Sequence, residues 1–426
     1  MVHVVVVGGG ISGCGAALTA RKCGAEVTLI EKIDTLVSGA KRAGRIFNGG
    51  LVALEEAKAL GGGDLFEVLE SIVIHDTGIP GEGRCIVYNC GLVEIRIREF
   101  LVNMGIKIRL ETRVMNAESS SDRVTSVELE DGTIIETDGV VDSSGGAGGV
   151  ELCTKYGKGC IMCIYKCPVF GDRVSIATKL GGVEKIRLRP NGKPGTVGAA
   201  ISLHKTSLSP DLRERIERDG TVLIPLPQDI IDANLQKLKE QASGRTEAQM
   251  RTLNLVDIGI SAKIVGAAYM SLPMMRRLPG METVEIEEPA GAGKFNKITG
   301  LSIMLHDHAL KVDGFSNLFC AGEHSGKVGV ADCLSSGLLS GHNAVRTAVG
   351  KEPLVLSRKL IIGESIAYFS DGTRNGDTLQ GRFGNMGQGP FFDHIKQLGL
   401  YSEDAEIIHK RVSDAGLKGV FSEKIA

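Results

Sequence analysis

The first thirty residues constrain the fold of this chain more than any other segment. The apolar, β-branched run from His3 to Val7 predicts a strand buried on both faces, as in a parallel sheet. A G-x-G-x-x-G pattern follows at once, from Gly8 to Gly13, and leads into a helix of small residues that ends at Gly24. Ala25 to Ile30 predicts a second strand, which is closed by the acidic Glu31. Strand, glycine turn, helix, strand and terminal acid together predict a dinucleotide-binding βαβ unit.

Each part of this unit has a physical task. Gly8 makes the tight turn out of the strand, Gly10 lets the backbone approach a pyrophosphate, and Gly13 permits close contact between helix and strand. The helix begins near Ile11 and Ser12, where free N–H groups and the positive end of the dipole favour phosphate. The carboxylate of Glu31 is expected to accept hydrogen bonds from a ribose.

The segment after Glu31 favours FAD over NAD. An NAD-binding half-domain normally runs straight into its next helix, whereas this chain continues with a long, glycine-rich and basic loop up to Gly50. We expect the loop to line the phosphate and flavin ends of an extended cofactor, through Lys32, Ser38, Gly39, Arg42, Arg45, Asn48 and Gly49.

Three separated motifs resemble the FAD-dependent oxidoreductases of the glutathione-reductase type. They are VVVVGGGISGCGAALTARKCGAEVTLIEK, the stretch from EIRIREF to VVDSSGG at residues 94–146, and NLFCAGEHSGKVGVADCLSSGLLSGHNAVRTAVGKEP. The resemblance implies that the end of the second motif passes under the cofactor, and that the third motif returns to the flavin and continues in a helix from Gly337 to Ala348 aimed at its pyrimidine end. The cofactor residues implied in these two motifs are Val114, Ser144, Gly145, Gly322, Glu323 and Gly337.

The third motif is also similar to the corresponding segment of the glucose-inhibited division protein and of the folate- and FAD-dependent tRNA uridine methyltransferase. The fold expected from these resemblances is α/β: a three-layer, Rossmann-like FAD-binding domain with a parallel sheet and a β-meander. It would comprise residues 1–150 and 300–350, interrupted by an inserted α+β substrate domain at 151–299 and followed by a C-terminal helical tail at 351–426.

Inside the insertion, the sequence predicts strands near Val174–Thr178 and Gly195–Leu203, then helices near Leu212–Arg218 and Ala233–Ala248. In the tail it predicts helices around Asp393–Leu398 and Ala405–Ala415, after a glycine-rich loop.

A cluster of cysteines, Cys160, Cys163 and Cys167 followed by Pro168, is the most unusual feature of the insertion. The C-x2-C-x3-C-P spacing matches the last three cysteines of a bacterial ferredoxin run, and Cys153 is a candidate fourth ligand. Three interpretations stay open: an iron–sulfur or zinc site, a redox-active thiol pair near the flavin, or buried structural cysteines.

Three histidines flank the return to the flavin and are candidate catalytic acids or bases. His306 and His308 come just before the third motif, and His324 follows its acidic residue Glu323. An imidazole near an isoalloxazine can exchange protons at neutral pH. The competing interpretation is that these are ordinary polar residues at a strand end.

Composition excludes several classes of protein. The chain has 426 residues, 23% of them charged, with a net charge of -2 and no tryptophan. No basic surplus exists to drive binding to nucleic acid, so we do not expect nucleic acid as a partner. No apolar run of about 18 residues predicts a membrane-spanning helix. The N-terminus lacks the features of a signal peptide, so a cytoplasmic location is expected.

These observations favour an FAD-dependent oxidoreductase that transfers a hydride or electrons between a small substrate and FAD, working as a homo-oligomer. No second G-x-G-x-x-G unit is visible, so electrons would come from NAD(P)H that docks transiently, from ferredoxin or a partner subunit, or from the substrate. Two alternatives stay open. One is an RNA-modifying flavoprotein like the folate-dependent methyltransferase, which needs a basic face and an available nucleophilic cysteine. The other is an iron–sulfur flavoprotein that carries electrons.

Overall fold

The computed structural model describes residues 1–76, 78, 83–146, 174–188, 196–197, 201–238, 251–265, 270–287, 298–299, 302–379 and 385–426. Among them no helix is long and apolar enough to cross a bilayer. The cysteine cluster Cys160, Cys163 and Cys167, and Cys153 before it, lie outside the described residues.

A five-stranded parallel sheet forms the centre of the larger body, in the order β19-β10-β1-β2-β6. Its central strand β1 (His3–Val7) pairs Val5 with Thr28 of β2 (Glu26–Ile30) on one side and with Val140 of β10 (Gly139–Asp142) on the other. The edge strands are β6 (Lys107–Arg109) and β19 (Leu318–Cys320). The expected strands are therefore confirmed, and their apolar runs are buried because both faces of the sheet are covered.

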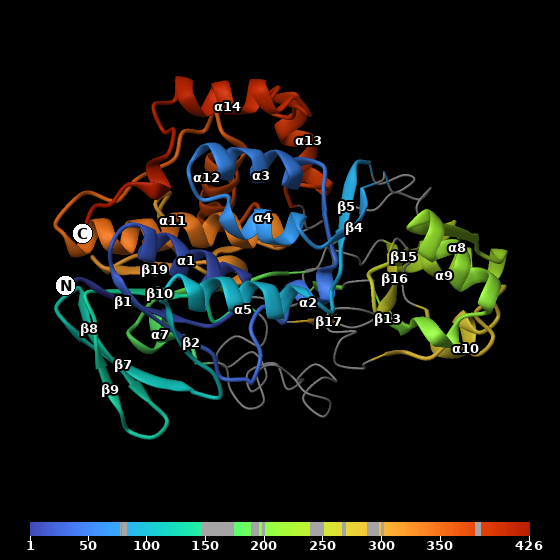
Figure 1. Cartoon of the computed structure of the whole chain (residues 1–426), viewed down its shortest axis with the longest axis horizontal. Coiled ribbons are helices and arrows are strands. Elements are labelled where there is room, and N and C mark those ends of the chain that lie inside the picture. The colour runs from blue at the N-terminus through green and yellow to red at the C-terminus, as the bar shows by residue number, and fades with distance from the viewer. Residues whose placement is uncertain are drawn as a thin grey trace.

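Helices cover one face of this sheet and a β-meander covers the other (Figure 1). The helical layer contains α1 (Ile11–Lys22), α5 (Val93–Asn103) and α11 (Val330–Ala348). The meander consists of β7 (Val114–Ser120), β8 (Arg123–Leu129) and β9 (Ile134–Glu136), with Gly132 in the positive-φ turn. This is the three-layer α/β arrangement that the sequence predicts.

Helices α1 and α11 cross with their backbones in contact. A Cβ on Gly337 would lie 2.0 Å from the carbonyl oxygen of Ser12, and a Cβ on Gly341 would lie 2.0 Å from that of Ala16. Glycine at these two positions, one turn apart, is therefore required for the crossing. The helix begins at Val330, seven residues before the predicted start at Gly337, so Gly337 lies inside the helix at this contact.

A second hydrophobic core lies within the expected insertion, at the right of Figure 1. It is built on the antiparallel sheet β13-β16-β15-β14, with strands Ile201–His204, Ser261–Val265, Thr252–Asp257 and Thr221–Pro225. Helices α8 (Pro210–Asp219), α9 (Gln228–Leu238) and α10 (Leu272–Met275) accompany it. The predicted helix at Leu212–Arg218 is confirmed. The predicted helix at Ala233–Ala248 begins earlier, at Gln228, and residues 239–250 lie outside the described part.

The strand predicted at Val174–Thr178 is wrong. These residues contain the short helix α7 (Ile176–Lys179), because the Ser175 side chain accepts a hydrogen bond from Thr178 N and so caps a helix start. Two short antiparallel pairs complete this region: β11 (Glu184–Ile186) with β18 (Ser302–Met304), and β12 (Thr196–Val197) with β17 (Ile298–Thr299).

The C-terminal tail shares a core with the N-terminal half of the chain. Its helices α13 (Gly389–Gln397) and α14 (Ala405–Asp414) confirm the two that the sequence predicts, and α12 (Ile361–Asn375) is an additional one. They pack with α3 (Gly49–Ala59). The same core includes α4 (Asp64–Glu70) and the sheet of β3 (Arg45–Phe47), β5 (Cys85–Tyr88) and β4 (Val73–Asp76). Buried Glu56 of α3 accepts hydrogen bonds from Ile361 N and Ile362 N, which fixes the start of α12.

Candidate cofactor site

Three parallel strands end side by side, and their following turns form one edge of the sheet. The Ser143 hydroxyl after β10 donates to Gly8 O after β1 at 2.7 Å. Ala321 N after β19 donates to Asp142 O at 3.1 Å. Ligands of open α/β sheets bind outside the carboxyl ends of the strands, so this edge is where a cofactor is expected.

The glycines of the first turn divide into two kinds. Gly8 has φ 104°, and a Cβ on Gly13 would lie 1.9 Å from Gly8 O, so both are needed for the fold itself. Gly10 has φ -63° and ψ 172°, which any residue adopts, and a Cβ there would meet no described protein atom within 4 Å. The lack of a side chain at Gly10 therefore leaves space at the start of α1 rather than relieving a clash.

Glu31 lies at the end of β2, where its carboxylate closes this edge. Its Oε2 accepts from Gly9 N at 2.7 Å and its Oε1 accepts from Ile33 N at 3.1 Å. Burial raises the pKa of Glu31, while these two backbone N–H groups oppose the rise. The neighbouring residues of the second motif lie close by, since Thr112 N donates to Glu31 O two residues before the predicted Val114.

Other residues predicted to contact the cofactor also fit a phosphate-bearing ligand. A Cβ placed on Gly39 or on Gly145, as on Gly10, would have no described protein atom within 4 Å, so no described residue occupies the space beside these backbones. The Ser144 hydroxyl is buried and has no hydrogen-bond partner in the described part of the protein. A buried donor without a partner is costly, and a ligand oxygen beside it would remove that cost.

The third motif contributes Gly322 and Glu323, in the short 3-10 helix η4 (Gly322–Ser325). Gly322 has φ 69°, and a Cβ there would lie 2.4 Å from the Ser12 hydroxyl of α1. The backbone N–H of Gly322 donates to the Ser336 hydroxyl of α11 at 2.9 Å. These contacts bring η4 together with α1 and α11.

The basic loop after Glu31 is held by the inserted sheet. Its centre is α2 (Ala40–Ala43), which contains Arg42 and is preceded by Ser38 and Gly39. Lys263 of β16 donates to Arg42 O, and to Ala43 O at 2.7 Å. An ammonium at the C-terminal end of a helix is favourably placed, so Lys263 stabilises this loop from the other core. Arg45 lies beyond it, 4.7 Å from the Phe47 ring centroid.

The end of the loop packs against the tail. Asn48 has φ 48°, and its side-chain amide donates to Gly387 O at 2.8 Å. Gly49 lies so close that a Cβ would be 2.2 Å from Met386 O. Asp332 of α11 accepts from Met386 N at 3.1 Å. The glycine-rich tail loop thus joins the predicted cofactor loop to α11, a connection that the sequence pattern does not reveal.

A buried lysine and a buried aspartate near the start of α11 belong to the same region, although sequence reasoning did not select them. Lys327 donates to Ser365 O and to the Ser365 hydroxyl, and its Nζ lies 4.5 Å from the Phe369 ring centroid. Burial lowers the pKa of Lys327 and raises that of Asp332, and their mutual attraction opposes both changes. The sequence signal that could have found them is a pair of charges inside an otherwise apolar and glycine-rich motif.

His324 is the candidate histidine that lies at the strand edge. Its side chain has no exposed surface; Nδ1 lies 3.3 Å from Asp142 Oδ1 and Nε2 lies 3.0 Å from Glu184 Oε1. Asp142 also accepts from the Ser175 hydroxyl and from Ser144 N. The imidazole ring of His324 thus lies between two carboxylates. His324 therefore ties α7 and β11 to the turn that follows β10.

Of the other two candidate histidines, His306 contacts the end of η4 and His308 lies against α12. His306 is buried, with Nδ1 2.7 Å from Asp307 O and Nε2 3.3 Å from Ser325 O, and burial lowers its pKa to about 4. His308 Nε2 lies 2.7 Å from Asp371 Oδ1 of α12, where both side chains are partly exposed. Their catalytic roles stay predictions, and within the described residues neither is hydrogen-bonded to Gly8 or Glu31.

The described cysteines are all buried: Cys14, Cys23, Cys85, Cys90, Cys320 and Cys333. Burial raises the pKa of Cys23 and of Cys90 to about 12 and raises those of Cys14 and Cys320 further. Buried neutral thiols are poor nucleophiles and poor metal ligands. Within the described ranges no group of three or more His, Cys, Asp or Glu residues is arranged to hold a metal ion. The metal interpretation of Cys160, Cys163 and Cys167 falls outside those ranges and stays a prediction.

The fold and this strand edge define an α/β protein with the FAD-binding fold of nucleotide-binding flavoproteins. A family model described as "Glucose inhibited division protein A" matches residues 3–260 and 267–352, which is most of the chain. The chain belongs to this family. The match includes all five strands of the parallel sheet and the whole of α11.

Individual relatives agree with the family. The chain is 26% identical over 417 residues to a "tRNA uridine 5-carboxymethylaminomethyl modification enzyme MnmG" of Geotalea uraniireducens, covering 83% of this chain and 64% of the relative. It is 27% identical over 112 residues to a "Methylenetetrahydrofolate--tRNA-(uracil-5-)-methyltransferase TrmFO" of Lysinibacillus sphaericus, 26% of this chain and 25% of the relative. The matched regions thus span less than two-thirds of these relatives. The solved structure of Aquifex aeolicus GidA has the same fold, with a TM-score of 0.64, 17% identity, and coverage of 97% of this chain and 76% of that one.

These relatives count against the expectation that nucleic acid is not a partner, since both curated names refer to tRNA. The expectation rested on a net charge of -2. Net charge is a sum over the whole surface, so it does not exclude a local basic face that contacts phosphates.

Proposed function

We propose that this chain binds FAD at the edge formed by β1, β10 and β19. The pyrophosphate would lie over Gly10 at the start of α1, and Glu31 would accept hydrogen bonds from the adenosine ribose. The open backbone at Gly39 and Gly145 and the unpartnered hydroxyl of Ser144 support this placement. The predicted contacts of Ile11, Ser12, Lys32, Val114, Gly322 and Glu323 belong to the same proposal.

We further propose that the enzyme modifies a uridine in tRNA. The observation that carries this proposal is the family match from residue 3 to residue 352, which covers the cofactor edge and the inserted core together. FAD supplies hydride and electron transfer when it is bound, which side chains cannot supply themselves. The substrate would approach from the insertion, because that core is linked to the cofactor loop through Lys263.

The residues of the site have separable tasks in this proposal. His324, fixed between Asp142 and Glu184, holds the turn that carries Ser144 and Gly145 in place. Lys327 and Asp332 fix the entry to α11 against α12 and the tail loop. In this proposal these groups hold the turns around the cofactor position in place.

A uridine-modifying flavoprotein of the methyltransferase kind needs an accessible cysteine, and the six described cysteines are buried. We therefore propose that thiol chemistry belongs to the segment with Cys153, Cys160, Cys163 and Cys167. The iron–sulfur and structural interpretations of the same cysteines remain alternatives to this one.

The test is whether holoprotein binds and modifies tRNA. Binding of an unmodified tRNA transcript should weaken steeply as KCl is raised, because each released counterion adds to the salt slope. A DNA duplex of equal length is the control for charge without RNA shape. Nucleoside mass spectrometry of tRNA from cells with and without this chain should show one modified uridine missing. Absence of salt-sensitive tRNA binding, or unchanged nucleosides, would contradict the proposal.

The second candidate function is an oxidoreductase acting on a small molecule, which the lack of a basic surplus in the sequence favours. It predicts that FAD is reduced by NAD(P)H or by a substrate and that tRNA has no effect on the reaction. Ferredoxin or a partner subunit would replace NAD(P)H as donor in the iron–sulfur variant of this function. Rates of flavin reduction with and without tRNA distinguish the two candidates.

A further inference from the structure

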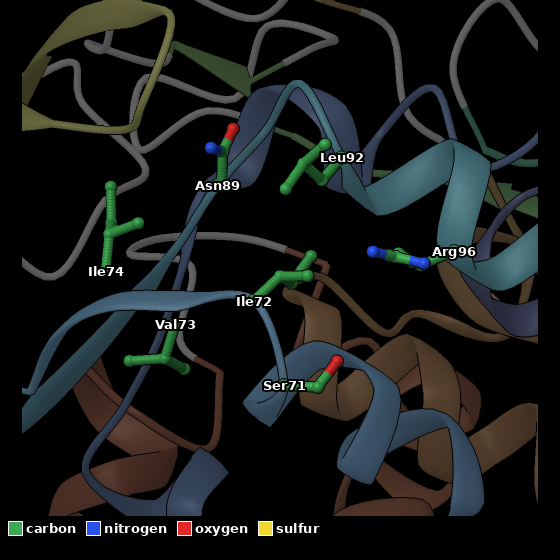
Figure 2. Close-up of a pocket in the computed structure, with 7 residues that line it drawn as sticks. All are labelled: Ser71, Ile72, Val73, Ile74, Asn89, Leu92 and Arg96. Carbon is green, nitrogen blue, oxygen red and sulfur yellow. The ribbon is translucent and has the colours of Figure 1, made fainter.

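A pocket of about 530 Å³ lies on the larger body, between β4, the end of β5 and the start of α5 (Figure 2). Its floor is aliphatic. The side chains that matter to the argument are Ile72, Val73, Ile74, Leu92, Asn89 and Arg96. This volume is within the range typical of small-molecule sites.

The pocket adjoins the place where the two cores meet. Cys90 N, next to the lining residue Asn89, donates to Ile258 O of the inserted domain at 3.1 Å. Asn89 is itself fixed, since its backbone N donates to Ile72 O and its Oδ1 accepts from Gly91 N. Small-molecule sites occur preferentially at such junctions.

Arg96 gives the pocket one positively charged end. Figure 2 shows its side chain extending from α5 toward Ile72 and Leu92. The guanidinium lies 3.4 Å from Glu99 Oε2, and both side chains are more than half exposed, so this ion pair holds Arg96 weakly. The guanidinium is therefore available to a ligand anion, and its two parallel N–H groups match a carboxylate.

The described lining of the pocket offers no aromatic ring on which a base could stack. None of the described residues that line the pocket is aromatic, and single-stranded RNA bases are usually bound by stacking on aromatic rings. Ile74 and Leu92 are 36% and 39% exposed, so an aliphatic ligand would remove apolar surface from water.

We propose that this pocket binds a small amphiphilic carboxylate, with its aliphatic part on Ile72 and Leu92 and its carboxylate on Arg96. The proposal does not depend on FAD or on tRNA. It assigns a ligand class to a pocket whose lining includes none of the residues proposed to contact FAD.

The test uses octanoate as the probe and octanamide as its uncharged counterpart, titrated into the full-length protein by calorimetry. Octanoate should bind, and octanamide should bind about tenfold more weakly, a difference of about 1.4 kcal/mol. Arg96→Gln should weaken octanoate by a similar factor and leave octanamide unchanged. Leu92→Asn should weaken both probes, because it removes part of the apolar floor.

Arg98→Gln is the matched control. Arg98 is on the same helix, pairs with Glu94 at 3.3 Å, and is not among the residues that line the pocket. It should leave both affinities unchanged. The proposal is overturned if octanoate does not bind, if octanamide binds as well as octanoate, or if Arg96→Gln and Arg98→Gln have equal effects. Thermal unfolding of each variant shows whether a loss of binding reflects loss of the fold.

Discussion

Substituting Gly10 by alanine tests the proposed cofactor site without disturbing the fold. A Cβ at this position meets no described protein atom within 4 Å, and the backbone angles suit alanine. The free energy of unfolding of the apoprotein should therefore change by less than about 1 kcal/mol, since a small cost at a helix N-cap is offset by reduced freedom of the unfolded chain.

The same methyl group would occupy the space proposed for the pyrophosphate. Overpacking a tight contact costs about 1–3 kcal/mol, which corresponds to about 5- to 150-fold weaker FAD binding. FAD titration followed by flavin fluorescence measures the affinity, and urea unfolding of the apoprotein measures stability.

Gly132→Ala is the reciprocal control. Gly132 has φ 83° in the turn between β8 and β9, in open space and away from the strand edge. Alanine there should lower stability by about 1–2 kcal/mol and leave FAD affinity unchanged. If Gly10→Ala protein binds FAD like the unmodified protein, the pyrophosphate does not lie at the start of α1 and the reasoning fails.

Three further predictions follow from buried contacts. In Gly341→Ala the new Cβ would lie 2.0 Å from Ala16 O, so the backbones of α1 and α11 would have to separate. We expect the free energy of unfolding in urea to fall by about 3 kcal/mol or more. An unchanged unfolding midpoint would refute the α1–α11 crossing. Burial, together with Arg346 and Lys351, lowers the pKa of His342 to about 4, so between pH 6.5 and 4 the unfolded chain binds a proton that the folded chain does not. The free energy of unfolding should therefore fall by about 3 kcal/mol as the pH is lowered through this window. The fall should be smaller in His342→Gln, and equal pH profiles of the two proteins would contradict this. Lys263→Met removes the hydrogen bonds that hold the end of α2. The loss in the free energy of FAD binding should therefore exceed the loss in the free energy of unfolding. If the variant binds FAD as tightly as the unmodified protein, Lys263 does not position the loop. In addition, iron and sulfide analysis of anaerobically purified protein tests the metal interpretation of Cys160, Cys163 and Cys167, and absence of both elements would remove the iron–sulfur alternative.

The sequence predicts an element correctly where its local pattern alone determines its place in the fold. The predicted run His3–Val7 is β1 and the predicted run Ala25–Ile30 contains β2, because short apolar, β-branched runs suit a sheet that is covered on both faces. The glycine turn between them has few alternative structures. The same reasoning misplaced the start of α11, because the glycines near Val330 look like a loop in sequence while in the structure Gly337 and Gly341 serve a helix crossing.

Other parts of the site depend on contacts between residues far apart in the chain. Lys263 reaches α2 from 220 residues away. In the tail loop, Gly387 accepts a hydrogen bond from Asn48, and Met386 lies against Gly49 and donates to Asp332. No local pattern in the sequence indicates such pairings. The same is true of His324, whose two carboxylate partners come from β10 and β11. Its position after Glu323 indicated a candidate but gave no means of ranking it above His306 and His308.

The visible absorbance spectrum of the purified protein, followed by chromatography of the cofactor that it releases, tests the central claim most directly. The account predicts flavin bands, and released FAD in about equal amount to the protein, with both restored when apoprotein is mixed with FAD. A colourless protein that FAD cannot reconstitute would contradict the cofactor site built on Gly8, Gly10, Gly13 and Glu31.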